Sequence, residues 1–110
     1  MAAGDRTETR LIGPTAVGST DTTLGTVAAS RVWVVKQFMI TNTNGVDAWV
    51  TIALGSTGTA SNAIFYQLPI AANDTVVFDT ALVATAAETI NGIADRTGVN
   101  VTAVGWVKEV

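Results

Sequence analysis

The run of residues at positions 31–43 constrains the fold more than any other part of the sequence. It consists mainly of β-branched, aromatic and other large side chains and contains neither glycine nor proline. Such residues are enriched in β-strands, and turn-forming residues lie on both sides of the run, so it predicts one long strand. Because a strand points alternate side chains to opposite faces, one face carries Val32, Val34, Lys36, Phe38 and Ile40, and the other carries Trp33, Val35, Gln37, Met39 and Thr41.

Both faces of this predicted strand are largely apolar. A strand with one face in water normally alternates apolar and polar residues. The face that contains Trp33, Val35 and Met39 is more apolar than that pattern allows. We therefore predict that another part of the chain, or another molecule, covers this face.

The rest of the chain is divided into short alternating segments by turn-forming residues. Further strands are expected at 22–28, 47–54, 63–68, 75–79, 89–95 and 99–110, and residues 81–88 are expected to form a loop or an irregular strand. The Asn44-Gly45 turn predicts a hairpin between 31–43 and 47–54. Many short strands at regular spacing are typical of a sandwich or barrel. We predict an all-β fold, an antiparallel β-sandwich of about seven to eight strands with jelly-roll or immunoglobulin-like connections.

Residues 1–20 are mostly polar, and Gly13-Pro14 interrupts them. They predict an extended N-terminal arm, and residues 21–110 predict a single β-sandwich domain, because 110 residues is the usual size of one domain. The arm has two interpretations. It is either a frayed terminus or a segment whose Leu11 and Ile12 dock onto a neighbouring molecule, since two adjacent aliphatic residues are unusual in a solvated tail.

Charge and hydropathy exclude two classes of partner. The chain has nine acidic and six basic residues, a formal net charge of −3, and its bases are scattered. Nucleic-acid binding needs clustered Lys and Arg, so we expect no nucleic-acid partner. No apolar run approaches the roughly 20 residues that span a membrane, and residues 1–10 lack the apolar segment of a signal peptide. We expect no membrane partner and synthesis in a cytoplasm.

The side chains that carry most enzyme chemistry are missing, because the chain has no His and no Cys. Their absence removes the commonest general base, the commonest metal ligand and every thiolate. Asp47, Asp74 and Asp95 each lie beside turn residues, where Asp commonly bonds the local backbone. Asp74 and Asp79 bracket a predicted strand and are therefore too far apart to act as one site. We expect no enzyme activity, no cofactor and no metal.

The three tryptophans, Trp33, Trp49 and Trp106, all lie opposite the main apolar alternation of their predicted strands. A contiguous apolar patch on a small domain marks a contact site, and Trp is a frequent interface anchor. The predicted subunit or capsid interface consists of Leu11, Ile12, Trp33, Val35, Met39, Trp49 and Trp106. One alternative is a β-bulge that shifts the alternation by one residue and places the tryptophans in the core. Another is stacking of an exposed tryptophan on sugars.

Several strand and turn segments together resemble the small β-sandwich virion proteins of tailed bacteriophages. They are Leu-Ile-Gly-Pro at 11–14, Val-Val-Lys-Gln-Phe-Met-Ile-Thr-Asn-Thr at 34–43, Val-Thr-Ile-Ala-Leu-Gly at 50–55, Leu-Pro-Ile-Ala-Ala-Asn-Asp-Thr at 68–75 and Gly-x-x-x-x-Val at 105–110. The resemblance covers nearly the whole chain from Leu11 onward and contains no chemical signature. Where such proteins often have Gly after Ala-Ala, this chain has Asn73, which also tolerates a left-handed turn.

The resemblance implies a structural part of a virus particle. The first hypothesis is a capsid decoration (cement) protein, which binds the major capsid protein on the surface of the icosahedral head and assembles as a homotrimer. The alternative is a tail- or fibre-associated module that binds a host receptor or glycan through exposed tryptophan and the loop at 55–62.

Overall fold

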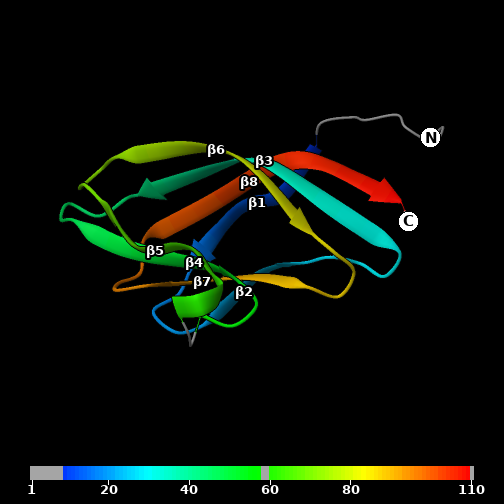
Figure 1. Ribbon diagram of the computed structural model, residues 1–110. Coiled ribbons are helices and arrows are strands. Elements are labelled where there is room, and N and C mark those ends of the chain that lie inside the picture. The colour runs from blue at the N-terminus through cyan, green and yellow to red at the C-terminus, as the bar shows by residue number, and fades with distance from the viewer. Residues whose placement is uncertain (1–8, 58–59, 110) are drawn as a thin grey trace.

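A computed structural model describes residues 9–57 and 60–109, and its strands form two four-stranded antiparallel sheets that lie face to face (Figure 1). Sheet A contains, in spatial order, β1 (Thr9–Val17), β8 (Val99–Glu109), β3 (Arg31–Asn42) and β6 (Thr75–Ala84). Sheet B contains, in spatial order, β2 (Thr22–Thr26), β7 (Thr89–Ala94), β4 (Ala48–Leu54) and β5 (Ala63–Ile70). A 3-10 turn, η1 (Ala60–Asn62), precedes β5. The described residues include no helix long and apolar enough to cross a membrane.

The pairing of the strands identifies a jelly roll. β1 pairs with β8, β2 with β7, β3 with β6 and β4 with β5, so the chain behaves as one long hairpin with its tip between β4 and β5. Rolling this ribbon brings β3 against β8 and β4 against β7. Eight strands in two such sheets form the jelly-roll architecture. The predicted antiparallel β-sandwich is confirmed, and the connections distinguish the jelly roll from the immunoglobulin-like alternative.

Two predictions about the organisation of the chain are wrong. Residues 9–17 are not an arm, because β1 pairs along β8 from Thr9 opposite Gly105 to Val17 opposite Val99; residues 1–8 lie outside the described residues. This strand was not predicted because Pro14 interrupts the segment. However, β1 is an edge strand, where proline is tolerated. The expected hairpin at Asn44-Gly45 is also absent, because this turn carries the chain from sheet A to sheet B.

A β-bulge in β3 determines which residues of sheet A face the core. Pairing with β8 shifts by one residue between Val35 and Gln37, so Val35 and Phe38, three positions apart, both face inward and are fully buried. Lys36, between them, is exposed. Gly105 lies opposite the bulge, and a Cβ on it would collide with the carbonyl oxygen of Val34.

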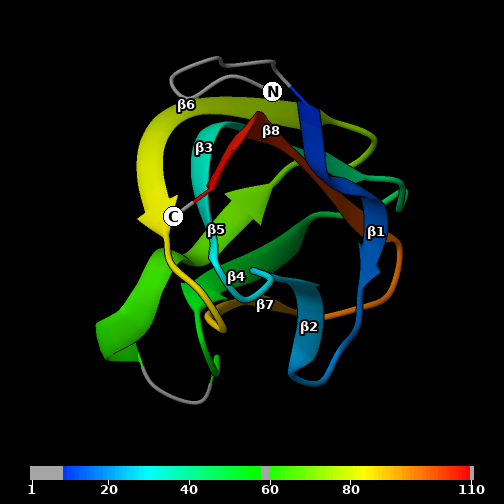
Figure 2. The same ribbon diagram turned by 90° about the vertical axis from the view of Figure 1, so that its right-hand side faces the viewer.

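Three phenylalanines close the side of the sandwich between β5 and β6. The ring of Phe65 in β5 contacts Phe38 in β3 edge-on, with centroids 5.6 Å apart, and lies 4.8 Å from the ring of Phe78 in β6. β6 arches over this side towards sheet B (Figure 2). Such aromatic pairs add about 0.5–1.5 kcal/mol each beyond the area they bury, so this cluster joins the two sheets where the strand edges leave the core open.

Buried Asn42 joins the loops at the opposite end from η1. Its side-chain Nδ2 donates to the carbonyls of Val46 and Ile70 at 2.9 and 3.1 Å. Its Oδ1 accepts from the backbone N–H and the side-chain Nδ2 of Asn44, and that Nδ2 also donates to the carbonyl of Thr97. One fully buried amide therefore holds together the β3–β4, β5–β6 and β7–β8 connections.

The G105A substitution is expected to lower the free energy of unfolding by at least about 3 kcal/mol, because the new methyl group requires β3 and β8 to move apart. The matched control is G45A, since a Cβ on Gly45 meets nothing within 4 Å. That variant should remain within about 0.5 kcal/mol of the wild type. Urea denaturation followed by tryptophan fluorescence measures both; equal stability of the two variants contradicts the close approach at Gly105.

The N42A substitution is expected to cost about 3 kcal/mol of stability, because the buried carbonyl of Ile70 and the partly buried carbonyls of Val46 and Ala71 lose their donor. N42D keeps the side-chain shape without the amide donor and should be destabilised at least as much. T97A, which changes an exposed side chain in one of the same loops, serves as the control and should stay within about 0.5 kcal/mol. Calorimetric melting compares the variants, and an N42A protein that melts with the wild type disproves the role of Asn42.

Candidate functional site: the outer faces of the two sheets

The outer face of sheet A carries two apolar rows that cross its strands. Pairing aligns Val83, Val34 and Trp106 in one row and Val77, Met39 and Thr102 in the other. Val77 is 53% exposed and Val83 is 51% exposed. These half-exposed valines leave apolar side chains in two separate rows at the free edge of the sheet, a surface suited to contact with a partner.

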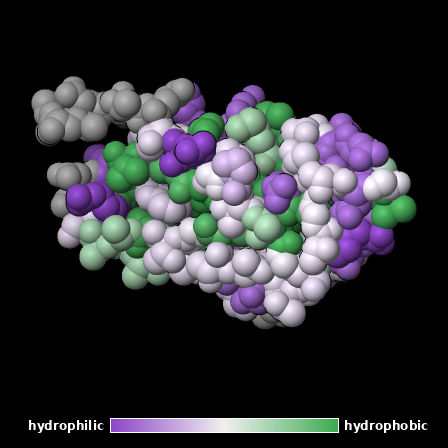
Figure 3. Space-filling view, turned by 180° about the vertical axis from the view of Figure 1, so that it is seen from behind, coloured by the Kyte–Doolittle hydropathy of each residue, from purple (hydrophilic) through white to green (hydrophobic). Residues whose placement is uncertain are grey.

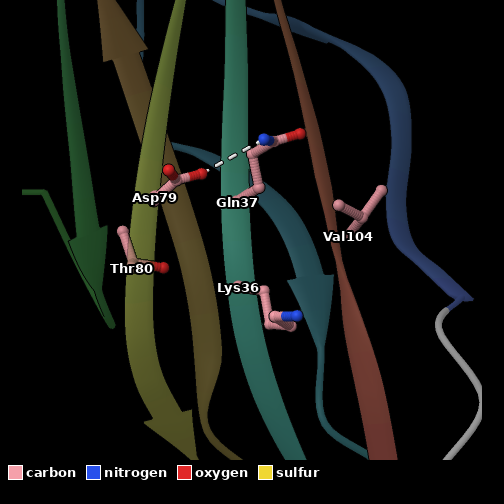
Figure 4. A pocket seen from close by; sticks show the side chains of 5 residues that line it. All are labelled: Lys36, Gln37, Asp79, Thr80 and Val104. Carbon is pink, nitrogen blue, oxygen red and sulfur yellow. Dashed lines mark hydrogen bonds between the residues drawn. The ribbon is translucent and has the colours of Figure 1, made fainter.

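A polar row separates the two apolar rows. Gln37 Nε2 donates to Asp79 Oδ1 across β3 and β6 at 3.2 Å, and the Lys36 Nζ lies 5.2 Å from the centroid of the Trp106 ring. A shallow depression of about 350 Å³ lies here, as Figure 4 shows, and is lined by Lys36, Gln37, Asp79, Thr80 and Val104. At this depression, the outer face of sheet A therefore combines apolar surface with one cation, one anion and an amide.

Three residues of the predicted interface point into the protein instead, and for these the prediction is wrong. Ile12 and Val35 are core residues with at most 2% exposure. The Trp33 ring packs against the core beside Gly25 of the opposite sheet. The bulge at Lys36 explains why Trp33 and Val35 face inward, because it reverses the alternation of side chains between Val35 and Phe38. Leu11 is partly buried against the same core.

The other three predicted residues do lie on outer faces, though on two different sheets. Met39 and Trp106 belong to the rows of sheet A, whereas Trp49 pairs with Pro69 on the outer face of sheet B. The three tryptophans therefore do not form one surface. Val77 and Val83 were not predicted from the sequence, although both alternate regularly with inward-facing residues of β6.

Sheet B differs from sheet A in charge. Its four strands contain no Asp, Glu, Lys or Arg, whereas the strands of sheet A contain Arg10, Arg31, Lys36, Asp79, Lys108 and Glu109. A sheet face without any charged residue is unusual for a surface in water, where charged side chains are common. Figure 3 shows the molecule from behind: strongly hydrophilic residues lie at the right-hand end and in smaller groups on the left, and most residues between them have near-neutral or positive hydropathy.

One part of the outer face of sheet B is held under the β4–β5 loop. Asp21 accepts hydrogen bonds from the Thr57 hydroxyl and backbone N–H at 2.7 and 3.1 Å, and from the Asn91 side chain at 3.2 Å. The Thr57 hydroxyl and backbone N–H together lower the pKa of the Asp21 carboxyl, since they stabilise its charged form. Asn91 and Ala53 are buried in consequence.

The other part of this face is open and centres on Tyr66. Tyr66 is 58% exposed, more than any other large apolar side chain among the described residues. It lies in a second bulge, where Tyr66 and Gln67 together oppose Thr51, and Gln67 has a left-handed φ of 46°. The Thr51 hydroxyl accepts from the Gln67 backbone N–H at 2.9 Å. Bulges of this kind redirect side chains, and here the bulge accompanies an aromatic ring held in solvent.

Acidic side chains do not gather into a metal-binding group anywhere in residues 9–57 and 60–109. Acids and bases are instead dispersed over loops and over sheet A. The candidate functional features of the described chain are therefore two surfaces, a mixed one on sheet A and an uncharged one on sheet B.

The fold places the protein in the class of jelly-roll β-sandwich domains. No family model and no curated protein matches the sequence. Among solved structures, the chain is similar to part of the structure of infectious bursal disease virus, Gx strain, with 15% identity and a TM-score of 0.50 over 94% of this chain and 31% of that chain. The chain thus spans about a third of that viral protein, and at this identity the likeness shows the fold alone.

A second similarity is to Bacillus endospore appendages, described as a novel family of disulfide-linked pili. It has 13% identity and a TM-score of 0.39, and it covers 100% of this chain and 95% of that chain. This likeness is too distant to carry an argument about the fold or the function.

Trp33 and Trp106 give a direct test of the two sides of sheet A. W33A is expected to cost about 3–5 kcal/mol of stability, because it leaves a cavity against the core. W106A removes an outward ring and its contact with the Lys36 cation, and should cost about 1 kcal/mol. Chemical denaturation measures both. A W106A protein that is destabilised more than W33A contradicts the inner and outer assignment.

Proposed function

We propose that this protein is a non-enzymatic structural component of a tailed-bacteriophage particle, a capsid decoration (cement) protein that binds the major capsid protein on the outside of the head. The observation that carries the proposal is the outer face of sheet A, where half-exposed Val77 and Val83 flank a polar row. The resemblance of the sequence to phage virion proteins supports the proposal. The small size of the chain and its low fraction of charged residues, 14%, also support it.

The proposed mechanism is adhesion repeated over many equivalent positions. Apolar rows exclude water at the contact, while Lys36 and Asp79 supply one charge of each sign for pairing with a different protein. A capsid lattice offers many equivalent sites, so weak binding by each copy adds up to a stabilised shell. The homotrimer expected from the sequence relied on a shared face of Trp33, Val35 and Met39. Only Met39 of these faces outward, and decoration through sheet A does not require a trimer.

A tail- or fibre-associated module that binds a host receptor or glycan is the second candidate. The outward Tyr66 favours it, because exposed aromatic rings anchor ligands as well as proteins. The two candidates differ in the part of the particle to which the protein is attached.

The location of the protein in the particle tests the proposal. DNA-filled heads without tails and detached tails are separated on a density gradient and probed with an antibody against the protein. The decoration proposal expects the protein on the heads. Its presence only on tails selects the second candidate, and its absence from both contradicts either one.

Purified heads stripped of the protein should bind it again, and binding should depend on sheet A. The double variant V77D/V83D is expected to bind about tenfold or more weakly, because a charge buried without a partner at the contact costs more than 1.4 kcal/mol. Y66D carries one such change on sheet B and serves as the control. Equal binding by V77D/V83D and wild type places the contact elsewhere and overturns the role of sheet A.

A further inference from the structure

The open part of the sheet B outer face combines features that a protein contact through sheet A does not use. Trp49, Tyr66, Gln67 and Pro69 lie around the β5 bulge, above the buried Thr51, and all are uncharged. Sheets A and B pack through their inner faces, so their outer faces point in opposite directions (Figure 1). A copy attached through sheet A would present this patch away from the attachment surface.

We propose that this patch is a binding site for a neutral polysaccharide, with a sugar ring stacked on Tyr66. The C–H groups of a pyranose ring carry a small positive charge and are attracted to the negative face of an aromatic ring. Tyr66 presents such a ring at 58% exposure. The neighbouring Gln67 side chain is also exposed, and its amide offers both donors and an acceptor to sugar hydroxyl groups.

The position of Tyr66 is held by the backbone and does not depend on a flexible loop. Phe65 points inward to Phe38 and Phe78, so the next side chain in the strand points outward. The left-handed Gln67 is kept in place by the Thr51 hydroxyl. A non-glycine residue in this region costs about 1 kcal/mol or more and persists where the surroundings fix it. The stacking ring is therefore preorganised, which lowers the entropic cost of binding.

The size of the patch decides between a sugar and a second copy of the chain. The open part covers two neighbouring strands, β4 and β5, for about four residues, roughly 10 by 13 Å or about 130 Å². A stable protein interface buries about 800 Å² on each partner. The patch is thus too small to hold a second copy alone, whereas one or two six-membered sugar rings match the size of an aromatic side chain.

Charge decides between neutral and anionic sugars. Carboxylated or sulfated polymers are recognised by Arg and Lys side chains, and the strands of sheet B contain neither. At the rim of the patch, Asp95 Oδ1 accepts from the Trp49 backbone N–H at 3.1 Å, and Asp95 also pairs with Arg96 at 3.5 Å. This ion pair adds no net charge at the rim, so it is the uncharged strands of sheet B that disfavour an anionic polymer.

Titration of the isolated protein with defined oligosaccharides tests the inference independently of its place in a particle. Hexasaccharides of glucose, mannose and galactose are added to about 10 mM, a range suited to dissociation constants near 1 mM, and amide and indole NMR shifts are followed. We expect shifts at Trp49, Tyr66 and Gln67 with at least one neutral sugar, and none with a hexamer of galacturonic acid. Y66A should weaken binding about tenfold, whereas V77A, which trims a similarly exposed side chain on sheet A, should not change it.

Four results overturn the inference. They are no shift with any neutral hexasaccharide, equal binding of the galacturonic acid hexamer, binding that is unchanged in Y66A, and shifts at the same residues that depend on protein concentration without sugar. The last result would identify a second copy as the occupant. None of these results alters the expected attachment to heads through sheet A, so failure of the sugar site and failure of the decoration proposal are distinguishable.

Discussion

The close approach of the Val34 carbonyl to Gly105 fixes the bulge in β3, and the assignment of side chains to the two faces of sheet A follows from it. Without the bulge, strict alternation would place Val35 opposite to Phe38 and leave a fully apolar residue in solvent. With it, Val35, Phe38 and Ile40 all enter the core. Glycine is required at 105 because only a residue without a Cβ leaves room for the neighbouring backbone.

This arrangement makes the core complete within one chain. From the sequence, we predicted that another part of the chain or another molecule covers the face with Trp33 and Val35. Sheet B of the same chain covers these two residues. Folding therefore does not require association, and the contacts that we propose involve only the outer faces. Sheet A presents apolar rows with charges of both signs, suited to a different protein, and sheet B presents an uncharged aromatic patch, suited to a neutral ligand.

The sequence predicted the strands well because their signals are local. Alternation and turn residues placed β3, β4, β5, β7 and β8 close to their observed positions, and the short, evenly spaced strands indicated a sandwich. The pairing of the strands was harder to predict from the sequence. Asn44-Gly45 has the composition of a hairpin turn, yet the chain crosses to the other sheet there. In a jelly roll, most paired strands are distant in sequence. β1 was missed because edge position, which makes Pro14 acceptable, is not visible in the sequence.

Which side chains lie on the candidate surfaces also depends on contacts between residues that are distant in the sequence. A bulge moves every following side chain to the other face, and the bulge in β3 depends on Gly105, which lies far along the chain in β8. Trp33 and Val35 were consequently misassigned, while Met39, beyond the bulge, was placed correctly on an outer face. Tyr66 was overlooked because its exposure results from a left-handed Gln67, a conformation that the sequence of β5 does not signal.

The dependence of stability on protein concentration tests the central claim most directly. If the core is complete within one chain, the thermal midpoint should stay constant when the protein concentration is raised from about 1 to 100 µM, because no association is coupled to folding. A midpoint that rises steadily with concentration would show that the chain folds only together with its neighbours, and would contradict the inward placement of Trp33 and Val35.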